Sequence, residues 1–304
     1  MLHNLAGNAG YNADDMITIP AAVPHATAKL LVALICALLA AASARAQGKL
    51  KAHYTISMTG VTIGEIVWLV GIGGTLYTTT ASGKASGVLS KLVNGEGSVE
   101  AQGSLAADRL MPSSYTSTIT DDDGTIKLQM TFVDGVATET IAPQPPVYAD
   151  RVPVTDADRR GIADPLSAVL LPTKLGGGAM AASDCHRTLN IFDGRRRYNL
   201  ALSYNRMDKV AVERGYSGPI LVCAVVLQPI AGYRADSMIV KYVAGRRNME
   251  LWFAPIAGTS IIAPLRVLMP TLIGTLKIQA DRFEAAAAAA TPAPVETAPL
   301  APPH

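Results

Sequence analysis

Hydrophobic and polar residues alternate in short runs through most of the chain after Leu50. The first two runs, 53–58 and 61–68, are rich in β-branched and aromatic residues, and Thr59-Gly60 separates them as a hairpin turn does. Because successive side chains of a strand point to opposite faces, such alternation is typical of strands that bury one face. We therefore expect an antiparallel meander to begin near residue 50.

Turn residues divide the rest of the chain into further short strands. Gly73-Gly74, Asp121–Gly124 and Asp134-Gly135 carry glycines that tolerate positive φ, and Asp193-Gly194 favours a two-residue type I′ hairpin. Short strands in this order predict a curved antiparallel sheet or half-barrel. The strands predicted after residue 68 are 76–80, 97–105, 114–120, 125–133, 136–141, 187–192, 195–204, 219–227, 248–253, 265–269 and 275–283.

One main α-helix is expected to cover part of this sheet. Asp164 is a suitable N-cap and Pro165 suits the first helical position, so we predict a helix that runs through Leu171 and stops at Pro172. The segment 143–161 before it is rich in proline and charge, which is typical of a connection. The predicted fold class is mainly β, a curved antiparallel sheet or half-barrel partly covered by one helix.

The N-terminal part of the chain has the features of a signal peptide. Residues 30–44 form an apolar run shorter than the ~20 residues that span a bilayer, with Lys29 before it and Ala44-Arg45-Ala46 after it. We expect signal peptidase to remove residues 1–46 and the mature protein to lie in the periplasm. Met16 is an alternative start that would shorten this segment. A retained inner-membrane anchor and a buried core helix are the other interpretations of the run.

After the signal segment we expect a β-rich domain, 47–284, and a tail, 285–304. The tail consists mainly of alanine and proline and has too few large apolar residues to form a packed core. A short alanine helix is expected directly after Phe283, with the rest of the tail disordered.

Two cysteines, Cys185 and Cys223, remain after the predicted cleavage, whereas Cys36 lies within the apolar run. In an oxidising compartment an even pair of cysteines in a mature domain indicates a disulfide. The alternative is two unrelated buried thiols. No third or fourth ligand stands near either cysteine at the spacing of a zinc site, so we expect no metal there.

Composition and motifs argue against several functional classes. The formal net charge is only +2 and aromatic residues make up 5% of the chain, so we expect no nucleic-acid partner. The chain has no glycine-rich phosphate loop and no nucleophile-elbow motif, which leaves no predicted cofactor and no predicted catalytic residue. A hydrolase that uses His53 or His186 in an unrecognised site stays open. The aspartates before Gly124 suit a solvated turn better than a calcium loop.

A ligand surface is the remaining hypothesis from the residues. On a strand that begins at Arg195, Arg195 and Arg197 share one face and can pair with an anionic head group on the concave side of the sheet. The apolar residues that we expect to line a hydrophobic groove beside them are Trp68, Phe132, Leu166 and Leu170. The alternatives are a charged strand edge for the arginines and ordinary core packing for the apolar residues.

Several landmarks together resemble the uncharacterised periplasmic family called domain of unknown function 3108. They include Ile63-Gly64-Glu65, Tyr115, Asp164 with Ser167, Phe192–Tyr198 and Tyr216–Pro219 before Cys223, followed by Trp252, Pro264–Arg266 and Gly274. The resemblance covers roughly Lys49 to Phe283. It implies an exported protein whose curved antiparallel sheet is similar in outline to the periplasmic lipoprotein-carrier half-barrels, and it implies no activity.

These observations lead to three hypotheses about function. The first is a non-enzymatic periplasmic protein that binds a lipid or another amphipathic envelope ligand in its curved sheet. The second is an envelope assembly or structural protein whose edge strands and tail bind another protein. The third is the hydrolase with an unrecognised site.

Overall fold

The computed structural model describes residues 47–87, 95–106, 108–143, 149–175 and 177–287, which fall in one compact unit. The predicted signal peptide and nearly all of the predicted tail lie outside the described residues. Within the described ranges, no helix has the length and apolar character required to cross a membrane.

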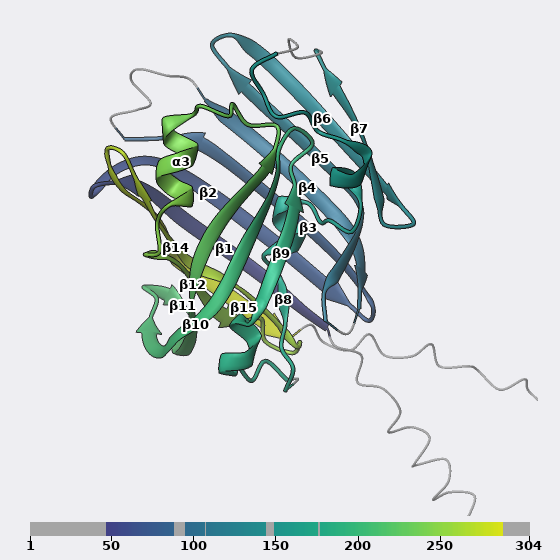
Figure 1. Ribbon diagram of the computed structural model, residues 1–304. Helices are drawn as coiled ribbons and strands as arrows, with labels where there is room; N and C mark the ends of the chain where they lie inside the picture. The colour runs from purple at the N-terminus through teal and green to yellow at the C-terminus, as the bar shows by residue number, and fades with distance from the viewer. Residues whose placement is uncertain (1–46, 88–94, 107, 144–148, 176, 288–304) are drawn as a thin grey trace, which may run out of the picture. The chain divides into compact units, whose positions relative to one another are not determined.

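Strands form most of the described structure and join into one 15-stranded sheet (Figure 1). Their bounds are β1 (Gln47–Met58), β2 (Val61–Gly73), β3 (Leu76–Ala85), β4 (Glu96–Leu105), β5 (Leu110–Asp121), β6 (Gly124–Val133), β7 (Val136–Ala142), β8 (Leu171–Pro172), β9 (Arg187–Phe192), β10 (Arg197–Ala211), β11 (Arg214–Gly215), β12 (Ser217–Ala231), β13 (Met249–Pro255), β14 (Ile261–Thr271) and β15 (Gly274–Ala287). The described helical segments are η2 (Asp156–Arg159), α2 (Pro165–Ala168), η3 (Ala182–Cys185) and α3 (Met238–Ala244).

The sheet is built from two antiparallel meanders that meet at the first and last strands. Its order is β7-β6-β5-β4-β3-β2-β1-β15-β14-β13-β12-β10-β9, and each neighbouring pair along this path is antiparallel. The short strands β8 and β11 pair with β14 and β15, the second of them in parallel. The predicted fold class, mainly β with a curved antiparallel sheet or half-barrel, is confirmed: the sheet is one long antiparallel sheet with few helices.

Two of the predicted hairpin turns have positive φ at both central residues. Thr59 and Gly60 have φ values of 50° and 87°, and Asp134 and Gly135 have φ values of 51° and 73°. A type I′ turn requires positive φ at both central residues, and asparagine, aspartate and glycine adopt it most readily. The turns at these positions therefore link β1 to β2 and β6 to β7 as expected.

The turn predicted at Asp193-Gly194 is longer than two residues. Phe192 pairs with Arg197, so the turn comprises residues 193–196 and Arg195 does not belong to a strand. The reason lies in the Asp193 side chain, whose Oδ1 accepts hydrogen bonds from the backbone N–H groups of Arg195 (2.9 Å) and Arg196 (2.6 Å). Aspartate at the start of a turn often makes such bonds to residues that follow it.

The predicted helix begins where expected and ends early. The Asp164 carboxylate caps α2 by accepting from the N–H groups of Leu166 and Ser167, each at 3.0 Å. The helix ends at Ala168 rather than Leu171, because Leu171 and Pro172 form β8 and pair with β14. Pairing with the sheet therefore outweighs local helix propensity at these two positions. The helix α3 was not predicted; its N-cap is Ser237.

The sheet folds back so that its two halves share a core. In Figure 1, β9, β10 and β12 lie across β1–β4, and the core cluster that includes Leu50 and Trp68 also contains Ile220 and Val222 of β12. The short helix α2 contacts β4, β5 and β9, so it lies between the halves. A second cluster lies around Cys223, and a third joins Tyr115 of β5 to Phe192 of β9.

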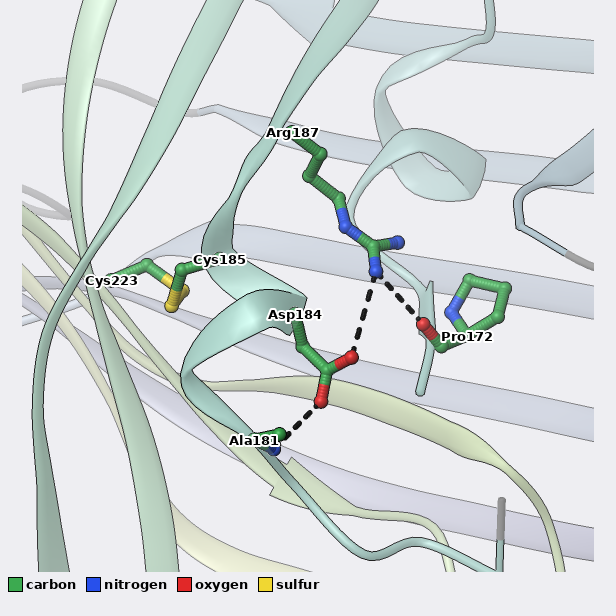
Figure 2. Close-up of a disulfide and its surroundings, with 6 residues drawn as sticks. All are labelled: Pro172, Ala181, Asp184, Cys185, Arg187 and Cys223. Carbon is green, nitrogen blue, oxygen red and sulfur yellow. Dashed lines mark hydrogen bonds and ion pairs between the residues drawn. A yellow bond between two sulfur atoms is a disulfide. The ribbon is translucent and has the colours of Figure 1, made fainter. Parts of the chain in front are cut away.

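The predicted disulfide is present. Cys185 and Cys223 are bonded, with their Cα atoms 5.5 Å apart and both residues fully buried. Figure 2 shows the neighbouring Asp184, whose buried carboxylate accepts from the N–H of Ala181 at 2.8 Å. Arg187 donates to the carbonyl oxygen of Pro172 at 3.0 Å. The disulfide and the Arg187 hydrogen bond attach the segment before β9 to β12 and to β8.

The last strand is longer than predicted. β15 continues through Ala287, and Ala285 and Ala287 pair with Leu50 and Gly48 of β1. The helix expected directly after Phe283 is therefore absent at residues 284–287, because the neighbouring strand offers this segment backbone partners. The rest of the predicted tail lies outside the described residues.

Candidate ligand groove

Along β2, β3 and β4 the side chains that face α2 change from large to small. The inner face is identified by Tyr77, whose hydroxyl lies 2.6 Å from Ser167 Oγ of α2. At one end of these strands the inner positions hold buried Trp68 and Tyr77. Towards the other end they hold Gly83 and Gly97, which are directly opposite each other. Two neighbouring positions without side chains leave a hollow in the inner face.

A groove of about 870 Å³ occupies this hollow. Glycines 64, 83 and 97 form part of its floor, and Ile66, Val99 and Ile119 from the neighbouring strands make its walls apolar. Pro165, Arg195 and Tyr198 line it from the α2 and β9–β10 side.

Gly194 lets the β9–β10 turn approach the floor of the groove closely. A Cβ atom at Gly194 would clash with the end of the Leu128 side chain of β6, which would have to move. Gly194 also has a φ of 87°, which favours glycine. The turn therefore rests on Leu128, and this contact places Arg195 and Arg196 at the groove.

Arg195 is the cation of the groove that is available to a ligand. Its side chain is half-buried, and no described residue forms a hydrogen bond or ion pair with its guanidinium. Arg196 is exposed, lies 3.9 Å from the Asp193 carboxylate and stacks over the Tyr233 ring at 5.8 Å. A half-buried guanidinium without a counter-ion attracts carboxylate or phosphate.

Among the other charged residues that line the groove, Lys84 is paired with Glu65, and Glu96 and Asp121 add negative charge. Lys84 Nζ lies 3.0 Å from Glu65 Oε1, and this hydrogen bond holds the pKa of Glu65 below its usual value, with His53 as a smaller contribution. Because Lys84 is engaged with Glu65, its attraction for an anion in the groove is weaker than that of Arg195.

Of the six residues predicted for ligand binding, Arg195 lines this groove and the other five lie elsewhere. Arg197 is buried and donates to the Tyr198 carbonyl and to Asn199 Oδ1, both at 2.6 Å, so the predicted shared face with Arg195 is wrong. The apolar residues contribute to packing: Trp68 and Leu170 are buried in the core, and Phe132 and Leu166 pack against it.

Leu170 also lines a second, smaller cavity of about 470 Å³ next to α2. Its floor includes Leu171 and Leu189, and Arg187 lies at its edge. The Arg187 guanidinium already donates to the carbonyl oxygens of Pro172 and Asp108. This cation is therefore less available to a ligand than Arg195.

Asp164 introduces a buried polar group between the core and the groove. Its Oδ1 caps α2, whereas its Oδ2 is buried without a hydrogen-bond partner among the described residues. Burial raises the pKa of Asp164 to about 6, although the bonds from Ser167 and Leu166 oppose the shift. The next residue, Pro165, lines the groove, so this carboxyl group supports one wall of it.

The histidines do not form a nucleophilic site with a described hydroxyl group. His53 Nδ1 donates to Asp281 Oδ1 at 2.7 Å, and its Nε2 lies 3.7 Å from Glu65 Oε2. The hydroxyl of Thr55 donates to Asp281 rather than to His53. His186 is exposed beside the disulfide. Among the described residues, no three His, Cys, Asp or Glu side chains gather as a metal site.

Comparisons with known proteins concern the fold and the family. A family model described as "Protein of unknown function (DUF3108)" matches residues 53–281. A crystal structure of a β-barrel-like protein of the domain of unknown function DUF1849 from Brucella abortus is similar over 79% of this chain and 98% of that chain, with 9% identity and a TM-score of 0.45. No curated protein matches the sequence.

Sequence reasoning missed the floor of the groove, although a signal for it exists. Gly83 and Gly97 interrupt runs that otherwise alternate as strands, and glycine inside a strand often marks a close approach or a space for another molecule. The motif residues Gly64, Tyr115 and Arg195, which carry the family resemblance, all line the groove.

Proposed function

Because the chain belongs to the family described as a protein of unknown function, DUF3108, we propose its function from the groove: non-enzymatic binding of an amphipathic envelope ligand with an acyl chain and an anionic head group. The observation that carries the proposal is a glycine-floored apolar groove beside the Arg195 guanidinium, which has no partner among the described residues.

The groove suits an acyl chain in size and in lining. Its volume of about 870 Å³ lies within the range of about 300–1,000 Å³ that is usual for small-molecule sites. Each methylene group that moves from water into such a lining contributes about 0.8 kcal/mol. A chain of several methylene groups therefore gains enough free energy to offset its loss of motion.

Arg195 favours an anionic head group over a neutral one. The guanidinium is always charged and presents donors in a plane that matches a carboxylate or phosphate. Since Asp193 bonds to the backbone of the turn through Oδ1 and its Oδ2 lies near Arg196, it does not neutralise Arg195.

The periplasm is part of this proposal. The predicted signal peptide supports it, and so does the disulfide, because disulfides persist in oxidising compartments and are rare in the cytosol. Lipids and other acylated molecules of the envelope are accessible there.

Native mass spectrometry and a fluorescent fatty acid test the proposal. Protein purified without detergent should carry an acylated anion, and a fatty acid with a fluorescent chain should bind in a saturable way. Arg195→Ala should weaken binding of the fatty acid by about tenfold, the loss expected for a charge-assisted hydrogen bond of about 1.5 kcal/mol. Arg214→Ala, which changes an exposed arginine of β11, is the matched control and should bind normally.

Two results would contradict the proposal. One is the absence of any bound or exchangeable acyl ligand in the folded protein. The other is equal binding of the fatty acid by the wild type and Arg195→Ala, together with tighter binding of the fatty alcohol of the same chain length. This result would show that the anionic group plays no part.

A further inference from the structure

Exposed apolar side chains gather at one end of the fold. Leu272 and Ile273 form the turn between β14 and β15, Met238 and Ile239 begin α3, and Val61 follows the turn between β1 and β2. These five residues, here called the apolar rim, are between 50% and 76% exposed. Large apolar side chains with this exposure at adjacent positions are typical of an interaction surface.

Contacts between the three elements bring the rim together. Tyr242 and Val243 of α3 belong to the same cluster as Met269 of β14, and β14 leads directly into the turn at Leu272. The β1–β2 turn touches the β14–β15 turn, because the Thr59 N–H donates to the Thr275 carbonyl at 3.0 Å. Figure 1 shows α3 and these two turns at the same end of the described structure.

Positive charges accompany the rim. Lys241, Arg246 and Arg247 lie on or directly after α3, and Lys277 follows the β14–β15 turn. In the described part of the chain, none of these four has a carboxylate partner. A short helix with exposed apolar residues and unpaired cations has the composition of a segment that lies on an anionic membrane surface.

At the opposite end of the sheet the exposed apolar residues stand on separate elements, among them Leu175 beside Lys174 after β8. Leu76 and Val133 are exposed there, but they stand on β3 and β6, with two strands between them. Single exposed apolar residues are usual on soluble proteins. Leu76 and Val133 are therefore suitable control positions, because they are as apolar as the rim residues and belong to the same chain.

The rim also lies close to the groove. Ile63 and Gly64, which line the groove, come two and three residues after Val61 along β2, and Ile56 of β1 lines the groove just before the same turn. A surface that rests on the rim therefore meets the end of the groove where β1 and β2 turn.

We propose that the apolar rim docks on an anionic lipid bilayer, with Leu272, Ile273, Met238 and Ile239 inserted among the head groups. The cations on and after α3 face the lipid phosphates in this arrangement. Docking places the groove next to a source of acyl ligand, but it does not depend on the groove being filled.

A local fluorophore tests this contact in the full chain. Ile273→Cys, in a Cys36→Ser background, is labelled with an environment-sensitive dye and mixed with phosphatidylcholine vesicles that contain phosphatidylglycerol. We expect a blue shift with these vesicles and a weaker one with phosphatidylcholine alone. Leu76→Cys with the same label is the control and should show no shift. The dye reports its own surroundings, so attachment through another part of the chain does not produce the signal.

Rim variants supply a second measurement. With the label at Met238→Cys, the double variant Leu272→Ser/Ile273→Ser should need about tenfold more lipid for the same shift, since it removes roughly 1–2 kcal/mol of apolar burial. The variant with Leu76→Ser should match the parent. Because all of these positions are exposed, thermal unfolding should change little.

Each outcome supports or contradicts the proposal that the apolar rim docks on a lipid bilayer. Equal shifts at residues 273 and 76, or no shift at either, overturn the proposal. A shift at residue 273 that appears at high protein concentration without vesicles assigns the rim to a second copy of this chain and also overturns it. Groove variants that lose the fatty acid but retain the shift leave docking intact, so the failure of one proposal does not imply that of the other.

Discussion

The two ends of the inner face of β2–β4 differ although they belong to the same strands. One end is filled by Trp68, Val70, Ile72 and Tyr77, all buried. At the other, Gly83 and Gly97 leave a groove of about 870 Å³. One sheet with a regular backbone therefore has a packed core next to an open groove. The size of the side chain at each inner position determines whether that position is packed or open.

This contrast separates positions that maintain the fold from positions that suit a ligand. At the filled end, removal of a side chain leaves an empty cavity. At the open end, addition of a side chain fills a space that the fold does not need. The helix α2 contacts both ends, through the Ser167–Tyr77 bond and through Pro165 at the groove.

The largest effect should come from the filled end. Trp68→Ala should lower the free energy of unfolding by about 3–5 kcal/mol, because it creates a cavity and leaves Thr79 Oγ1 without the bond from Trp68 Nε1. Urea unfolding measures this loss. Leu69→Ala, the next residue on the outward face, should cost far less. Similar losses for the two variants would show that the filled end does not act as a core.

Loss of the disulfide should be the next largest effect. The bond closes a loop with a separation of 38 residues. For such a loop the chain-entropy account gives about 4 kcal/mol, and measured values are often smaller. Cys185→Ala/Cys223→Ala should therefore unfold at clearly lower urea, and reduced wild type should match it. A double variant as stable as the oxidised protein would mean that noncovalent contacts alone hold η3 against β12.

Ionisation of Asp164 should lower the free energy of unfolding by about 3 kcal/mol, because its pKa is about 6 in the folded protein against an ordinary 3.8. Below both values the carboxyl group is neutral in both states and costs nothing. As the pH rises from about 4 to 6, the unfolded chain ionises first, so wild type loses stability, and the loss is complete above the folded pKa.

The variant Asp164→Asn isolates this effect, since its side-chain carbonyl can still cap α2. As the pH rises from about 4 to 7, the variant should become more stable relative to wild type, as judged by the free energy of unfolding of each. Parallel pH curves would show that Asp164 ionises normally. Glu65, Asp158 and Glu250, whose pKa values are lowered, contribute in the opposite direction, but they are common to both proteins.

The filled end could be predicted from the sequence better than the open end. Alternation and turn dipeptides such as Thr59-Gly60 located the strands, and the two cysteines located the disulfide, because these signals are local or nearly unique in the chain. The groove depends on Gly83 and Gly97 meeting across two strands, and on Gly194 resting on Leu128. These contacts between residues far apart in the sequence depend on the register of the strands and on how the two halves of the sheet pack together.

The predicted ligand residues illustrate the same limit. Trp68 and Leu170 are apolar and near the concave face, but their size places them in the core. Arg197 begins β10 and is buried, whereas Arg195 stands in the turn at the groove, a difference that depends on the length of one turn. Residue type alone indicated that arginine and apolar side chains would line a site. It did not distinguish Arg195 from Arg197, or groove residues from core residues.

The smallest effect on stability, and the most direct test of the open end, should come from Gly97→Val. Gly97 lies within β4 without a positive φ, and an added Cβ would lie 3.3 Å from the Thr118 carbonyl oxygen and 3.7 Å from Ile119 Cγ1. Valine favours strands, so we expect a change in stability of less than about 1 kcal/mol in either direction.

The same substitution should abolish binding of the fluorescent fatty acid, because the isopropyl group fills the groove between Gly83 and Ile119. Gln102→Val, on the same strand but on the exposed outward face, is the matched control and should bind normally. A Gly97→Val protein that folds and binds the fatty acid like wild type would place the ligand outside the groove. Loss of folding instead would mean that the small residues are required for close strand packing, so that both ends of the inner face serve the core.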